Sequence, residues 1–129
     1  MSYHYLVERR TRQREAIQRA FTDADRPLSP QEVTALARRE VPALGIATVY
    51  RNLKALVAEG ELRPVELPGK PDRYEPAGKA HHHHFHCRRC DGVFEVQGCP
   101  AGVKRLAPRG FRTDGHELTL YGLCDRCAT

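Results

Sequence analysis

The first half of the chain places apolar residues at helical spacing, separated by residues that start and stop helices. Within residues 11–22, Ile17 and Phe21 lie four positions apart, with Ala16 and Ala20 beside them. This spacing gathers the apolar side chains into one stripe along a helix. The sequence therefore predicts a first helix that begins near residue 11 and ends near residue 22.

The segment SPQE predicts the start of a second helix. Ser29 stands at the N-cap, Pro30 at the first helical position and Glu32 at the position that completes a capping box. Pro42 cannot continue a helix and Gly45 is typical of a turn, so this helix is expected to end at the segment VPALG.

The segment ATVYRNLKALVAEG predicts a third helix with two different faces. Its apolar residues recur at helical spacing and should face a core: Val49, Leu53, Leu56 and Val57. Tyr50, Arg51 and Lys54 lie on the opposite side. Such a face is typical of any solvated helix, so by itself it does not distinguish a DNA-reading helix from an ordinary surface.

The segment that follows, residues 61–76, predicts two short strands around a Pro-Gly-Lys-Pro turn. We expect Arg63, Lys70 and Arg73 to be exposed on it. Three helices and a hairpin form the winged helix-turn-helix pattern, in which the third helix enters a major groove and the hairpin lies along the backbone. This order of elements favours DNA binding over the solvated-face interpretation.

The exposed face of the third helix suits that role. Arg51 can donate to guanine or phosphate, Lys54 can meet phosphate, and Tyr50 offers a ring to a thymine methyl group. Arg12 and Arg14 belong to a cluster of arginines that falls at the start of the predicted first helix, where positive charge opposes the helix macrodipole. Phosphate contact is therefore one explanation for them, and ordinary solubility is the other.

The charge and composition of the chain are consistent with binding to an anionic partner. The chain has 129 residues, a formal net charge of +5 and a pI near 9.1, and a basic balance of this kind suits nucleic acid without requiring it. No apolar run approaches the roughly 20 residues that span a bilayer. The first residues lack the order of a signal peptide, so no membrane partner and a cytoplasmic location are expected.

The second half carries metal ligands rather than helices. Cys87 and Cys90 form one C-x-x-C pair, and Cys124 and Cys127 form another. A thioredoxin-like motif needs only one such pair. Two pairs supply four thiolates for a closed tetrahedral zinc. The segments GVFEV and GFRTDGHELTLYGLC around this site predict strands, the second half-buried with alternating faces, and PAGVKRLAP predicts one short helix.

The histidine run beside Cys87 and Cys90 should also be divided between the two faces of a strand. If residues 81–87 are extended, His82 and His84 share one face while His81 and His83 share the other. Glu75 and Glu95 are candidates to complete a metal site with His82 and His84. His116 is a candidate to complete a second site with His81 and His83. A purification tag is the alternative interpretation, but the run is internal and continues directly into a cysteine pair.

In order along the chain, GIATVYRNLKALVAEG, RYE, HHHH, CRRC, HELTLYGLC and CDRC resemble the ferric uptake regulator family. The resemblance covers essentially the whole chain. It implies an α+β fold, with a winged-helix DNA-binding domain at residues 1–76 and a dimerisation and metal-binding domain at residues 77–129. It also implies a homodimeric repressor, not an enzyme, whose metal loading favours binding to a palindromic double-stranded operator.

The resemblance also implies roles for single residues. Structural zinc falls on the four paired cysteines, and Tyr50 and Arg51 read DNA. The remaining metal ligands form two sets: a regulatory hinge site of Glu75, His82, His84 and Glu95, and a further site of His81, His83 and His116.

Two positions depart from the family. The segment DADRPLSP before the second helix lacks a histidine that many members use at the hinge, and Gly102 stands where members commonly have a glutamate at the further site. Cys99 is left over and is expected to be a buried structural thiol, with a ligand or redox thiol as the alternative. His86 is expected to be packed or to support a ligand rather than to bind metal.

For the regulatory divalent metal, the many imidazoles and few carboxylates favour Zn²⁺ over Fe²⁺ or Mn²⁺. An iron-responsive or peroxide-sensing regulator of the same family is the alternative, and a DNA-binding protein with purely structural zinc is a second. A zinc deaminase would need an H-x-E arrangement, which does not occur in this sequence.

Overall fold

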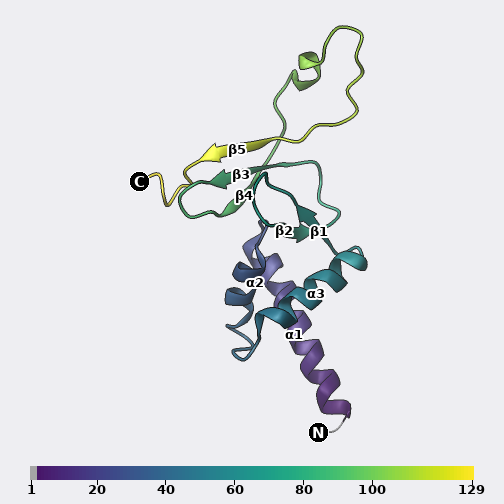
Figure 1. The fold of residues 1–129 in the computed structure, drawn as a ribbon, viewed down its shortest axis with the longest axis vertical. Coiled ribbons are helices and arrows are strands. Elements are labelled where there is room, and N and C mark those ends of the chain that lie inside the picture. Colours follow the sequence, from purple (N-terminus) through teal and green to yellow (C-terminus); the bar gives the residue numbers. More distant parts are fainter. Residues whose placement is uncertain (1–2) are drawn as a thin grey trace. The chain divides into compact units, whose positions relative to one another are not determined.

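The computed structural model describes residues 3–129, which form two compact units (Figure 1). The first unit reaches to Gly78, and the second comprises Lys79–Thr129. The first contains α1 (Tyr3–Ala24), α2 (Pro30–Ala37), α3 (Ile46–Ala58), β1 (Leu62–Val65) and β2 (Arg73–Pro76). The second contains β3 (His83–Cys87), β4 (Val93–Val96), the 3₁₀ helix η1 (Val103–Leu106) and β5 (Thr119–Gly122). The predicted α+β class is confirmed.

The core of the first unit lies where the three helices pack on one another. The predicted stripe of α1 is buried in it, with Ile17 0% and Phe21 2% exposed. From α3, Val49, Leu53 and Leu56 are also buried, as predicted. These contacts fix the direction of α3 and leave its opposite face to solvent.

The start predicted for α1 is wrong, because the helix begins at Tyr3 rather than near residue 11. The earlier turns contain no glycine or proline, and arginine is a good helix former. The His4 and Glu8 side chains pair at 2.9 Å across one turn, and the Thr11 hydroxyl donates to the Val7 carbonyl. Figure 1 shows these turns extending past α2 and α3. The cluster of arginines therefore lies within the helix, where the macrodipole argument does not apply.

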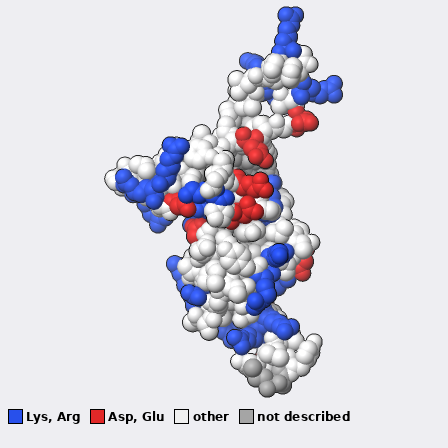
Figure 2. Space-filling view, viewed as in Figure 1, with Lys and Arg blue, Asp and Glu red and all other residues white. Residues whose placement is uncertain are grey.

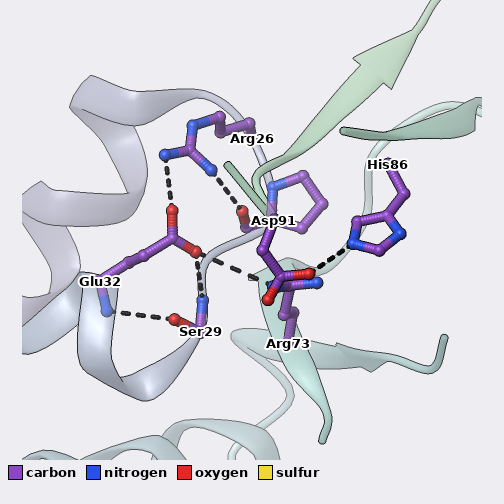
Figure 3. A network of polar contacts seen from close by, with 7 residues as sticks. Arg26, Ser29, Glu32, Arg73, His86 and Asp91 are labelled. Atoms are coloured by element: carbon purple, nitrogen blue, oxygen red, sulfur yellow. Dashed lines mark hydrogen bonds and ion pairs between the residues drawn. The ribbon is translucent and has the colours of Figure 1, made fainter. Parts of the chain in front are cut away.

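The capping box of α2 is confirmed (Figure 3). The Glu32 backbone N–H donates to Ser29 Oγ at 3.1 Å, and the Ser29 backbone N–H donates to Glu32 Oε1 at 3.0 Å. The helix ends at Ala37, earlier than predicted. There the backbone tightens into a turn, and the Arg38 guanidinium donates to the Leu44 carbonyl at 2.7 Å.

The hairpin pairs β1 with β2 in antiparallel register, and a bridge between Leu28 and Tyr74 joins β2 to the segment before α2. Arg63 and Lys70 are exposed as predicted. The prediction for Arg73 is wrong, because this residue is only 5% exposed. Alternate residues of β2 are buried, and Arg73 is the first of them. Its Nε lies 4.0 Å from the Glu32 carboxylate, which supplies the opposite charge.

The second unit is a three-stranded sheet in the order β4-β3-β5, with β3 antiparallel to β4 and parallel to β5. The segment GVFEV forms β4 as predicted, and PAGVKRLAP contains only the 3₁₀ turn η1. The half-buried alternation predicted for the last strand is wrong. β5 is an edge strand, and Leu120 and Tyr121 on opposite faces are 45% and 42% exposed. None of the helices within residues 3–129 is long and apolar enough to cross a membrane.

Candidate functional site

The four paired cysteines converge in the second unit. The sulfur atoms of Cys87, Cys90, Cys124 and Cys127 all lie within 4.8 Å of one another, and none forms a disulfide. Cys90 Sγ and Cys124 Sγ are 3.9 Å apart. Tetrahedral zinc with Zn–S bonds of ~2.3 Å requires a sulfur separation of about 3.8 Å. The donor set and its spacing therefore fit a structural zinc ion.

Backbone contacts prepare these thiols for a cation. The backbone N–H of Cys90 points to Cys87 Sγ and lowers the pKa of Cys87 to about 6. The thiol of Cys127 shares a hydrogen bond with Cys124, and this raises the pKa of Cys127 to about 12. These contacts favour the thiolate at Cys87 and the protonated thiol at Cys127. A divalent metal would replace the protons that remain.

A second donor group lies at the start of β3. The rings of His82 and His84 stand edge to face, with centroids 4.9 Å apart, and His82 Nε2 lies 3.9 Å from Glu95 Oε1. His82 Nδ1 is 2.7 Å from the Ala80 carbonyl oxygen. A carbonyl can only accept, so Nδ1 carries a hydrogen and Nε2 is the ring nitrogen that faces Glu95. The ring of His82 is thereby held in the orientation that a metal ligand needs.

The carboxylate of this group already has a cationic neighbour, since Lys79 contacts Glu95 Oε1. A metal bound at this position would replace Lys79 as the partner of that charge. Glu75, the remaining predicted hinge residue, belongs to β2 in the first unit. It is fully buried, and its Oε1 accepts from the exposed Arg63 side chain at 2.7 Å.

The other face of the histidine run forms a third group. His81 Nε2 and His116 Nε2 each lie 3.1 Å from His83 Nε2. Burial lowers the pKa of His83, and the neighbouring His81 and His116 lower it further. The structure therefore brings together the three histidines that the sequence assigned to a further site.

Cys99 is the residue of this group that sequence reasoning misplaced. Its Sγ lies 3.0 Å from His116 Nε2, and the residue is exposed, so the expectation of a buried structural thiol is wrong. The antiparallel register places Val96 opposite His83. Cys99 follows Val96 by only three residues, so it stays close to His83. The pairing of these two strands was therefore the feature that could have located Cys99. Gly102, the departing position, offers no side chain.

His86 stays outside both histidine groups, as predicted. It is buried, and its Nε2 lies 2.6 Å from Asp91 Oδ1 (Figure 3). The Tyr121 ring packs against it edge to face, with centroids 5.8 Å apart. Asp91 follows Cys90 in a left-handed turn with φ of 65°. His86 therefore ties that turn to β3 rather than offering a ligand.

The predicted DNA-reading face of α3 is exposed. Tyr50 is 46% exposed, and Arg51 and Lys54 are also exposed. Between α1 and α3 lies a hollow of about 480 Å³, and its basic lining residues are Arg10, Arg14 and Arg51. Lys and Arg side chains are spread over the visible face of the helical part of the chain (Figure 2). A hollow of this charge suits a phosphate group.

The two arginines of α1 that the sequence suggests as phosphate contacts differ in their surroundings. Arg12 is exposed. Arg14 donates to Glu59 Oε2 at 2.8 Å and also pairs with Glu61, and these contacts raise the pKa of Arg14. Its charge is therefore already balanced within the first unit. Arg10, which belongs to the same cluster of arginines predicted from the sequence, also lines the hollow.

A winged-helix unit with an exposed basic helix, joined to a sheet with a four-thiolate cluster, defines a metal-binding transcriptional regulator. The family model of the ferric uptake regulator family matches residues 8–121. The chain belongs to this family, whose members are metal-responsive transcriptional regulators and not enzymes. Regulators of this family bind DNA and are generally dimers.

Three relatives illustrate the similarity. The ferric uptake regulation protein of Bacillus subtilis is 33% identical over 124 residues, which cover 91% of this chain and 83% of the relative. A zinc-bound manganese uptake regulator superposes with a TM-score of 0.75 at 26% identity, covering 87% of each chain. FurB of Mycobacterium tuberculosis, a zinc uptake regulator, gives a TM-score of 0.51 at 31% identity, covering 92% of this chain and 95% of its own. The metals in these names differ from one relative to the next.

Proposed function

We propose that this chain is a metal-dependent, DNA-binding repressor that responds to zinc. Residues 1–76 bind DNA, and residues 77–129 dimerise and hold metal. The observation that supports the proposal is the donor group at the start of β3, where His82 is buried, its ring is oriented by the Ala80 carbonyl, and its Nε2 faces Glu95. The four-thiolate zinc beside it is structural.

The hinge site couples metal to DNA binding. Glu75 lies near the end of the first unit, and His82, His84 and Glu95 lie in the second. One metal bound by all four links the two units and favours the conformer that fits the operator. Metal affinity and DNA affinity are then raised by the same factor, and such couplings are worth about 1–3 kcal/mol.

The DNA contacts come from two helices. Tyr50 and Arg51 read bases from α3, Lys54 meets phosphate, and Arg12 adds a phosphate contact from α1. Arg14 contributes only if phosphate replaces its glutamates. A homodimer presents two such surfaces related by a two-fold axis, so the operator is palindromic.

Zinc is proposed because the histidine run offers many imidazole nitrogens and few carboxylates, a balance that suits zinc more than manganese. The similarity to a zinc uptake regulator supports this choice. An iron-responsive regulator is the competing candidate, since the Bacillus subtilis relative is named for ferric uptake.

The test is operator affinity measured with and without a second metal while the thiolate zinc stays in place. The operator is selected from a randomised duplex library with the zinc-loaded protein. Zinc should raise the affinity roughly 5–150-fold in the native chain. It should have no effect on His84→Ala, whereas the control His4→Ala should respond as the native chain does.

Equal affinity with and without a second metal would contradict the metal-dependent mechanism. In that case a DNA-binding protein with purely structural zinc remains. A response to Fe²⁺ but not to Zn²⁺ would identify the iron-responsive alternative.

A further inference from the structure

We propose that Cys99 is a metal ligand, and that it joins His81, His83 and His116 in a site with three nitrogen donors and one sulfur donor. Neither the sequence motifs nor the family similarity assigns a role to this cysteine. The inference concerns the second unit alone and does not depend on the hinge site.

The four side chains converge as ligands do. The ligand atoms of this group all lie within 4.8 Å of one another. His83 Nε2 lies 3.1 Å from the Nε2 atoms of both His81 and His116. Tetrahedral zinc with Zn–N bonds of ~2.0 Å requires a separation of about 3.3 Å between its nitrogen ligands. Cys99 Sγ approaches the same point from the loop after β4, 3.0 Å from His116 Nε2. Four donors for one tetrahedral ion are therefore present.

The histidines do not satisfy one another without an ion. A hydrogen bond between two Nε2 atoms needs a hydrogen on one and a lone pair on the other. His83 Nε2 has either one hydrogen or one lone pair, yet two other Nε2 atoms lie 3.1 Å from it. A cation at the centre would accept all the lone pairs together.

The thiolate determines which metals this site prefers. Sulfur is a soft donor that suits zinc or cobalt, whereas manganese and magnesium prefer oxygen. A carboxylate in its place would widen the range of metals. Cys99 therefore makes the site selective for zinc over manganese.

The site also restrains a long loop. Cys99 lies near the beginning of the segment between β4 and β5, and His116 lies near its end. Leu106 and Phe111, between them, are 83% and 71% exposed. A metal that bridges Cys99 and His116 would clamp the base of this loop to β3, so metal binding should slow tryptic cleavage at Lys104 and Arg105.

The experiment uses the full chain with the thiolate zinc in place and Co²⁺ as the probe. Titration should produce a thiolate-to-cobalt charge-transfer band with one ion per chain, absent from Cys99→Ser. The hinge residues contain no sulfur, so they cannot produce this band. Any exchange of cobalt into the four-cysteine site would persist in Cys99→Ser and is subtracted. The substitution should weaken cobalt binding roughly 10–100-fold.

Alkylation of Cys99 by iodoacetamide, read by peptide mass, gives a second measurement. Co²⁺ or Zn²⁺ should protect this thiol, Mn²⁺ should not, and His116→Ala should abolish the protection. The same spectrum and affinity in Cys99→Ser, or an alkylation rate that metal leaves unchanged, would overturn the proposal. Because His84→Ala leaves all four of these ligands intact, failure at the hinge and failure here are separable.

Discussion

Glu32 offers a quantitative test of how the first unit is stabilised. Its carboxylate accepts from the Ser29 backbone at 3.0 Å and from Arg26 Nη2 at 2.7 Å, and it lies 4.0 Å from Arg73 Nε (Figure 3). The first contact caps α2, and the other two balance charge at partly buried and buried arginines. One side chain therefore performs two separable tasks.

The magnitudes follow from those tasks. Ser29→Ala removes its half of the capping box and should cost about 1 kcal/mol. Glu32→Gln keeps an oxygen that can accept from the Ser29 backbone but loses the charge, and hydrogen bonds to charged groups contribute about 1.5–3 kcal/mol. Glu32→Ala loses both, so we expect a decrease of roughly 2–4 kcal/mol in the free energy of unfolding. Gln31→Ala, an exposed neighbour, is the control and should change it by less than about 0.5 kcal/mol.

The assay is urea unfolding followed by the helical circular dichroism signal, with the thiolate zinc retained. Among residues 3–129 every α-helix belongs to the first unit, so this signal reports the unit that contains Glu32. The expected order of stability is native, Ser29→Ala, Glu32→Gln, then Glu32→Ala. If Glu32→Gln is as stable as the native chain, the charge contacts contribute nothing and the reasoning fails.

Two further predictions concern pH and metal. Hydrogen bonds from the Arg19 guanidinium, at 2.7 Å, lower the pKa of Glu40 below its ordinary 4.5. A depressed carboxyl pKa stabilises the fold above pH 4.5, and this contribution is lost as pH falls through the folded-state pKa. Arg19→Gln should therefore raise the NMR titration midpoint of Glu40, and an unchanged midpoint would refute the pairing. Chelating the thiolate zinc should unfold the second unit, because such sites contribute ~10–16 kcal/mol of apparent folding free energy. Amide protection in β3 that survives chelation would contradict this, while the helical signal of the first unit should remain.

Local sequence rules predicted the elements that depend on near neighbours. The capping box needs only Ser29, Pro30 and Glu32, which lie within one turn, and the core face of α3 follows from helical spacing. The early start of α1 was missed because no breaker or cap marks it, and a run of good helix formers extends as far as its end contacts allow.

The errors arise where contacts between distant segments decide the outcome. Arg73 looks like a surface residue of a hairpin, yet it is buried and its positive charge lies 4.0 Å from the carboxylate of Glu32 in α2. Cys99 looks like a spare thiol, yet the strand register and the loop after β4 bring it to His116. Neither partner is visible in local spacing, because both depend on how the elements pack.

The run of four histidines leads into β3, and its last two members, His83 and His84, lie on that strand. Successive side chains of a strand point to opposite faces, so the same run feeds one group on each side. Register then selects the partners, since His84 lies opposite Glu95 and His83 opposite Val96. A slip of one residue would exchange the two groups and bring each histidine to the wrong partners. Metal binding on either face should hold that register, so the two candidate sites stabilise each other through the strand they share.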